Sequence, residues 1–105
     1  MEHLDATQVL AALRGRTILT LTGRPNGVLR LQGDQVFVAT NRSPEGQPVP
    51  VAWVQDALDR LVRDGEVEIT VTSVGYRSAF IGAVLSTIPG AIPGQRIVRL
   101  PRGGR

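Results

Sequence analysis

The spacing of apolar residues predicts a short helix near the start of the chain. Val9, Leu10 and Leu13 recur at helical spacing. Either Asp5 or Thr7 can supply the N-cap, and Gly15 is a natural stop. The first element is therefore expected to be a helix of two to three turns.

Alternating apolar and polar residues then replace this helical spacing. Residues 17–22 alternate and are rich in β-branched side chains, residues 28–32 alternate again, and residues 35–40 are expected to make a third strand. Pro25 and the pair Asn26-Gly27 predict a hairpin turn over residues 23–27, because that pair favours positive φ. Gly33-Asp34 predicts the second turn. Together these signals predict a three-stranded antiparallel meander.

A second helix is predicted in the middle of the chain. Residues 41–48 form a polar loop with proline, glycine and asparagine turn signals. Pro50 suits the first turn of a helix, and apolar residues between Val54 and Val62 form one stripe before Asp64-Gly65 ends it. A fourth strand is expected over 66–71, followed by a loop.

The last part of the chain predicts a buried helix and an arginine-rich tail. Ser78 can cap a helix that runs to about Thr87 and ends before Pro89-Gly90. The tail, 91–105, is expected to be either a linker or a short edge strand at Arg96–Leu100. We therefore expect an α+β fold over residues 1–90: a small curled antiparallel sheet, the meander plus one or two further strands, packed with two to three helices.

Composition places the chain among small intracellular proteins. Its 105 residues suit one domain, and a hydrophobic share of 42% allows one modest core. There is no cysteine, no apolar run long enough to span a membrane and no signal-peptide pattern at the N-terminus. We expect a cytoplasmic, nucleoid-associated protein without a membrane partner.

The charged residues are unusual in type and in position. All twelve basic residues are arginine, whose planar guanidinium binds phosphate or guanine through two parallel hydrogen bonds. Five of the nine acidic residues fall in one short stretch: Asp56, Asp59, Asp64, Glu66 and Glu68. The sequence thus predicts an acidic side and a side that faces polyanions.

The residues that catalysis would need are scarce. His3 is the only histidine and lies at the N-terminus, so no nucleophile has an orienting base. The carboxylates lie on outward faces, and no glycine-rich phosphate loop follows a strand. We expect a protein that is not an enzyme and has no cofactor, metal site or small-molecule substrate.

Three places qualify as binding sites, each with a structural alternative. Asn41, Arg42 and Ser43 can reach a phosphate or a base edge, or they form an ordinary turn. Trp53, at the edge of the second helix's apolar stripe, offers a stacking surface or packs over the core.

The third place is the segment Tyr76-Arg77-Ser78, just ahead of the last helix. Backbone N–H groups at a helix N-terminus favour anions, and Arg77 beside a tyrosine hydroxyl would form a phosphate clamp. The apolar residues that follow, Phe80 among them, are expected to lie in the core.

Three segments in combination resemble a known module: RTILTLTGRPNGVLRL, ATNRSPEGQPVPVAWVQDALDRLVRDGEVEI and VGYRSAFIGAVLSTIPG. They are similar to the N-terminal DNA-reading module of actinobacterial, McrA-like, modification-dependent HNH restriction endonucleases and related stand-alone 5-methylcytosine-binding proteins. The resemblance spans about residues 10–90. The His-rich motif of an HNH nuclease is absent from this sequence.

The resemblance implies a double-stranded-DNA-binding module, with recognition of 5-methylcytosine as the more specific form of the hypothesis. Trp53 or Tyr76 would contact the cytosine methyl, and Arg42 or Arg77 would pair with the neighbouring guanine. Arg24 and Arg30 would then anchor phosphates.

Two other readings stay open. The chain can be a protein-interaction or dimerisation domain, as a homodimer or beside a C-terminal effector domain. It can also bind single strands on the sheet, although four aromatic residues are few for stacking and Phe37 is expected to be buried.

Overall fold

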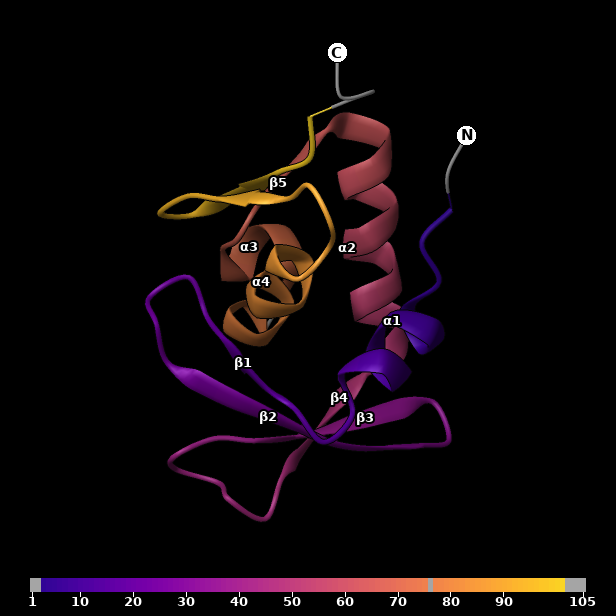
Figure 1. The fold of residues 1–105 in the computed structure, drawn as a ribbon, viewed down its shortest axis with the longest axis vertical. Helices are drawn as coiled ribbons and strands as arrows, with labels where there is room; N and C mark the ends of the chain where they lie inside the picture. The colour runs from indigo at the N-terminus through magenta and orange to yellow at the C-terminus, as the bar shows by residue number, and fades with distance from the viewer. Residues whose placement is uncertain (1–2, 76, 102–105) are drawn as a thin grey trace.

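Two antiparallel sheets and four helices make up the described residues, 3–75 and 77–101, of the computed structural model (Figure 1). The first sheet has the order β1-β2-β3-β4, with strands Thr17–Leu19, Pro25–Gln32, Gln35–Ala39 and Gln47–Pro50. The second has the order β5-β7-β6, with strands Glu66–Glu68, Ile97–Arg99 and Ile92–Pro93. The helices are α1 (Ala6–Leu13), α2 (Val51–Asp64), α3 (Val71–Val74) and α4 (Ser78–Ser86). The predicted α+β class is confirmed.

Helix α4 lies at the centre of the fold. Figure 1 shows it between the first sheet and the second, with α2 alongside, and it contacts α2, α3, β1 and β7. Every residue from Phe80 to Leu85 is buried. A helix that is apolar all round must be covered on all sides, so the two sheets and α2 close around it.

Helix α2 forms where the apolar stripe predicts it. Val54, Ala57, Leu58 and Leu61 are its buried residues, and Gly65 ends it with φ 80°. Gln55 also ties the start of α1 to α2. Its Oε1 accepts from the backbone N–H of Ala6 at 2.8 Å, and its Nε2 donates to the carbonyl of Leu4 at 2.7 Å. As predicted for the first helix, Asp5 caps α1 by accepting from the N–H of Thr7.

The predicted meander is present, but its first turn lies earlier than expected. Asn26 and Gly27 belong to β2, where they pair with Ile18 and Thr17. The chain reverses at Gly23, which has φ 86°, and the Thr20 hydroxyl accepts from the N–H of Arg24 at 3.0 Å. The hydrogen bond to the Thr20 hydroxyl and the positive φ of Gly23 are enough to form the turn. Asn26-Gly27 is therefore not needed for it.

The polar segment 41–48 ends in a strand that the sequence does not predict. Residues Gln47–Pro50 form β4 at the edge of the first sheet, with Val49 buried opposite Val36. Pro48 and Pro50 argue against a central strand, but an edge strand tolerates residues without an N–H. The two prolines hide the strand from a propensity-based reading.

Smaller differences concern the segment before α4 and the tail. The predicted strand over 66–71 ends at Glu68, and Thr70 then caps α3 by accepting from the N–H of Ser73 at 3.2 Å. Helix α4 begins at Ser78 itself, with Arg77 as the N-cap residue, so Ser78 is not the cap. In the tail, β7 lies between β5 and β6 rather than at an edge. The tail therefore contains strands at residues 92–93 and 97–99, but β7 is a central strand and not the predicted edge strand.

Gly82 marks the closest approach of α4 to its surroundings, and Gly82→Ala should destabilise the fold by about 1–3 kcal/mol. A β-carbon there would lie 2.8 Å from Cγ2 of Ile69, a branch methyl that cannot swing away, and 3.5 Å from Cγ of Leu21. Helix propensity alone predicts that Gly82→Ala would stabilise the protein, because alanine is the better helix former. Urea unfolding followed by circular dichroism measures the change.

The matched control is the same substitution in an Ile69→Ala background. There the clash partner is gone, so the penalty of Gly82→Ala should largely disappear. An equal penalty in both backgrounds would show that the contact with Ile69 is not its cause.

Candidate nucleic-acid interface

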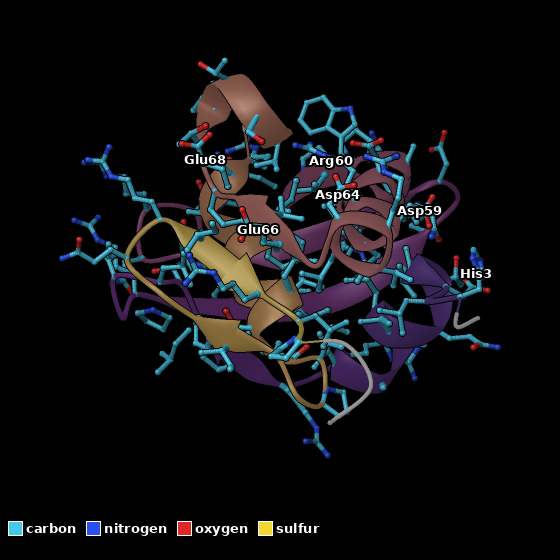
Figure 2. The ribbon with its side chains drawn as sticks, turned by 90° about the horizontal axis from the view of Figure 1, so that it is seen from above. His3, Asp59, Arg60, Asp64, Glu66 and Glu68 are labelled. Carbon is cyan, nitrogen blue, oxygen red and sulfur yellow. The ribbon has the colours of Figure 1, made fainter. Side chains whose placement is uncertain are left out.

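The five clustered carboxylates lie on one surface, formed by α2 and β5. Figure 2 shows Asp59, Asp64, Glu66 and Glu68 together in the view from above. All are exposed, and Asp56 lies one helical turn before Arg60 on α2. We call these five residues the acidic face.

Arginines on the acidic face are engaged with carboxylates. Arg60 lies 3.6 Å from Asp56, Arg63 lies 2.9 Å from Asp64, and Arg99 lies 3.3 Å from Glu66. The hydrogen bond to Asp64, together with the charge of that carboxylate, raises the pKa of Arg63. These guanidinium groups already have anionic partners, so the surface offers little to an incoming phosphate.

Arg60 has a second, structural role. Its Nη1 donates to the backbone carbonyl of Ser73 and its Nη2 to the hydroxyl of Ser73, both at 2.6 Å. Two parallel bonds from one planar group fix α3 against the side of α2. This arginine supports the fold and is not a candidate for ligand binding.

Three other arginines lie on connections between strands. Arg24 is on the β1–β2 turn, Arg42 on the β3–β4 loop and Arg96 on the β6–β7 turn, and all three are exposed. Figure 1 shows these three connections extending toward the same side of the molecule. Within residues 3–75 and 77–101, none of the three side chains has an ion-pair partner. We call them the tip arginines.

The β3–β4 loop presents two of its predicted site residues and buries the third. Asn41 and Arg42 are exposed, whereas Ser43 is only 8% exposed. The Ser43 hydroxyl accepts from Nε2 of Gln47 at 2.8 Å, and its backbone exchanges hydrogen bonds with that of Thr40. Ser43 thus holds the loop in shape while Asn41 and Arg42 occupy its outer surface.

Arg30 lies on the outer side of the first sheet, over an aromatic ring. Its guanidinium carbon is 4.2 Å from the ring centroid of Phe37, and its Nε donates to Oε1 of Gln32 at 3.4 Å. Phe37 is half-buried, so the expectation that it belongs to the core is wrong. Val36 and Val38 face the core instead, and alternation turns Phe37 outward.

Trp53 lies at the start of α2, against the segment that joins α3 to α4. The ring packs over Gly75: a β-carbon there would lie 3.7 Å from Cε3 of Trp53. Trp53 is nevertheless 39% exposed. The contact with Gly75 agrees with the packing alternative, whereas the stacking surface stays a prediction.

The Tyr-Arg-Ser segment is described only in part, because Tyr76 lies outside the described residues. Arg77 is partly exposed, and its backbone carbonyl accepts from the N–H of Ile81 at 3.1 Å. Ser78 is the first residue of α4 and is also partly exposed. Arg77 is therefore placed at a helix N-terminus, as the sequence predicts.

The predicted site residues thus fall into two groups. Arg24, Arg30, Asn41 and Arg42 belong to the first sheet and its connections, whereas Trp53, Arg77 and Ser78 belong to the helices. Arg96 joins the first group in its exposure and its lack of an acidic partner, although sequence reasoning did not single it out. Its signal was weak: an arginine after a Pro-Gly step in the tail.

Comparison with known proteins finds no matching family model, no matching curated protein and no matching solved structure. The resemblance to the DNA-reading module therefore stays a prediction. Among residues 3–75 and 77–101, no group of three or more metal-ligating side chains could hold an ion. In the same part of the chain, no helix has the length and hydropathy that crossing a membrane requires.

Gly75→Ala should disturb the Trp53 surface specifically. Gly75 has φ 98° and ψ −173°, a region nearly confined to glycine, so alanine there should cost about 1–3 kcal/mol of strain. Relief of that strain would move Gly75 away from the ring and shift the emission of Trp53, the only tryptophan. Tryptophan fluorescence and urea unfolding measure the two effects.

Gly15→Ala is the matched control, since Gly15 also has positive φ, 81°, but has nothing within 4 Å of a built β-carbon. It should lower stability without shifting the emission. Native emission and stability in Gly75→Ala would contradict the contact and the strain together.

Proposed function

We propose that this chain binds double-stranded DNA through the side of the molecule that carries the tip arginines. One observation supports this most directly. Arg24, Arg42 and Arg96 have no carboxylate partner among the described residues, whereas the arginines of the acidic face do. An approaching polyanion meets available guanidinium groups on one side and repulsive carboxylates on the other. The charge distribution therefore orients the protein on DNA.

The proposed contacts are mainly to phosphates. Exposed arginines on turns can straddle a phosphate backbone, and each phosphate that they neutralise releases counterions. Asn41, beside Arg42 on the same loop, can add a hydrogen bond to a phosphate or a base edge. Because the formal net charge is only +3, binding should be modest and should weaken strongly with salt.

The more specific form of the proposal is recognition of 5-methylcytosine. A cytosine methyl lies in the major groove and is read by apolar contact, as the thymine methyl is. Trp53 offers an exposed ring that Gly75 supports from behind. Arg77, two residues after Gly75, would pair with the neighbouring guanine. Tyr76 remains a second candidate for the methyl contact, as the sequence resemblance implies.

We propose binding without catalysis. The only histidine, His3, is exposed near the N-terminus, and the acidic face places its carboxylates in solvent. A general acid or base also has to lie within hydrogen-bond reach of a bound substrate, and these groups lie on exposed surface.

Protein association is the second candidate function, and the surface around Gly75 favours it. Trp53, whose ring packs over Gly75, is 39% exposed, and Val71 at the start of α3 is 60% exposed. The N–H of Gly75 donates to the carbonyl of Val71 at 2.9 Å. Sedimentation velocity over a range of concentrations separates the two functions: mass that rises with concentration, without DNA affinity, would favour association.

Replacing each tip arginine singly by alanine should weaken binding to a duplex. Each substitution should also reduce the slope of log K against log salt by up to about 0.9, the value for one lost phosphate contact. Fluorescence anisotropy with one labelled duplex at several salt concentrations measures both quantities.

Arg63→Ala is the matched control for these three variants. It removes the same charge from the acidic face, where the guanidinium is bound to Asp64. If this variant loses as much affinity as Arg24→Ala, net charge rather than the tip arginines determines binding.

The methylation hypothesis predicts tighter binding to a duplex that contains 5-methylcytosine than to its unmodified twin. Trp53→Ala should abolish the difference while leaving affinity for the unmodified duplex nearly unchanged, because the ring contacts only the methyl group. Val71→Ala controls for loss of exposed apolar surface nearby. Equal binding of both duplexes by the unaltered protein would remove methyl reading and leave a general DNA-binding module.

A further inference from the structure

A β-bulge turns Arg30 onto the outer face of the first sheet. Val28 pairs with Val38 and Arg30 pairs with Phe37, so Leu29 is an extra residue in β2. In a regular strand Val28 and Arg30 would face the same side, and Arg30 would point into the core beneath the sheet. The bulge shifts the alternation by one residue, so that Val28 is buried and Arg30 is exposed.

The extra residue also supports the loop that carries Arg42. The built β-carbon of Gly46 would lie only 2.7 Å from Cδ1 of Leu29, and Gly46 has φ 100°. Leu29 therefore packs directly on the backbone at the end of the β3–β4 loop, in space that only glycine leaves open. This contact joins the bulge, which precedes Arg30, to the loop that carries Arg42.

Phe37 and Gln32 fix the guanidinium of Arg30. Its guanidinium carbon lies 4.2 Å from the Phe37 centroid, and Gln32 accepts from Nε. Among the described residues, no hydrogen bond from Nη1 or Nη2 is present and no carboxylate lies within ion-pair distance of Arg30, so both nitrogens can donate to a ligand. A charged group that is held on two sides loses less side-chain entropy when it binds.

Arg30 is exposed on a face of the sheet that the helices leave uncovered. Figure 1 shows the helices on the other side of the first sheet, so no described helix covers the outer face. The residues beside Phe37 on the sheet are small or rigid. Pro48 pairs with Phe37 from the next strand, and Ala39, two residues along β3, pairs with Gly27. The end of the β3–β4 loop borders this face, because a β-carbon at Gly46 would lie 3.6 Å from Cβ of Phe37, so a partner would reach Arg30 beside that loop.

We propose that the bulge at Leu29 makes this outer face a preformed binding surface for the phosphodiester backbone of DNA. Arg30 is the contacting residue, and Phe37 and Leu29 are positioning residues. The inference rests on the proposed DNA binding and adds to it the place where the backbone crosses the sheet. Because a guanidinium with two free terminal nitrogens matches two phosphate oxygens, the contact is independent of sequence and of methylation.

The test compares five proteins on one labelled duplex by fluorescence anisotropy at several salt concentrations. They are the unaltered protein, Arg30→Ala, Phe37→Ala, the double variant and Arg99→Ala. Arg99 is the matched control, since it is also an exposed strand arginine but is paired with Glu66 on the acidic face. Thermal unfolding checks that each variant is folded. Phe37→Leu, which removes the ring but keeps an apolar side chain, replaces Phe37→Ala if the latter is not folded, and Phe37→Tyr, which keeps the ring, is the conservative control.

Arg30→Ala should weaken binding about tenfold at low salt and reduce the salt slope by about 0.9, whereas Arg99→Ala should change neither. The loss should be the same for methylated and unmodified duplexes. Phe37→Ala should weaken binding on its own but add nothing in the Arg30→Ala background, because it acts through Arg30. Phe37→Tyr should retain the native affinity.

Three results would overturn the inference in distinguishable ways. If the unaltered protein binds duplex DNA and Arg30→Ala binds equally well, this inference fails and the proposed function stands. If Phe37→Ala costs the same affinity with or without Arg30, the positioning role fails. If the unaltered protein binds no duplex at low salt, the proposed function and this inference fail together.

Discussion

The burial of α4 is the constraint on which the rest of the structure depends. Its residues from Phe80 to Leu85 are all buried, so the helix has no polar side that could face water. At Gly82 even a β-carbon is excluded by Ile69, which brings the helix close to the chain that covers it. A helix of this kind is stable only inside an enclosure, and at this chain length every segment has to contribute to it. The tail strands are part of that enclosure, because β7 packs on α4 from the side opposite the first sheet.

This enclosure determines where charge can go. Because the inner sides of both sheets and of α2 face α4, charged residues occupy outer faces and connections between strands. On α2 and β5 the outer positions are mostly acidic, and arginines among them form ion pairs across one turn or one strand. On the first sheet, the outer face and the connections hold arginines with few carboxylates nearby. The acidic face and the arginines of the first sheet therefore lie on different sides because different segments cover the central helix α4 on those sides.

The sequence predicts elements well where the signal is periodic and local. The stripe from Val54 to Leu61 defines α2, and Asp5 is a recognisable cap for α1. It predicts poorly where pairing partners decide the structure. Asn26-Gly27 favours a turn in isolation, but Gly23 and the Thr20 hydroxyl close the chain earlier. For the candidate site, Arg42 and Trp53 could be selected by residue type. The stacking of Arg30 on Phe37 could not be predicted, because it depends on one extra residue in β2, Leu29. That residue packs against Gly46, which is distant in the sequence.

Net charge is a poor measure of what the surface of this protein can bind. An arginine paired with a carboxylate has directed its donors at that partner, and a phosphate arriving there would have to displace one anion while approaching others. Arg63 and Arg99 are in this position. Arg24 and Arg42 are not, since each sits on a connection where no described carboxylate accepts from it. A protein of formal net charge +3 can therefore present a strongly cationic surface on one side. The pairing of charges, more than their sum, determines which surface a polyanion would meet and in which orientation the protein would lie on it.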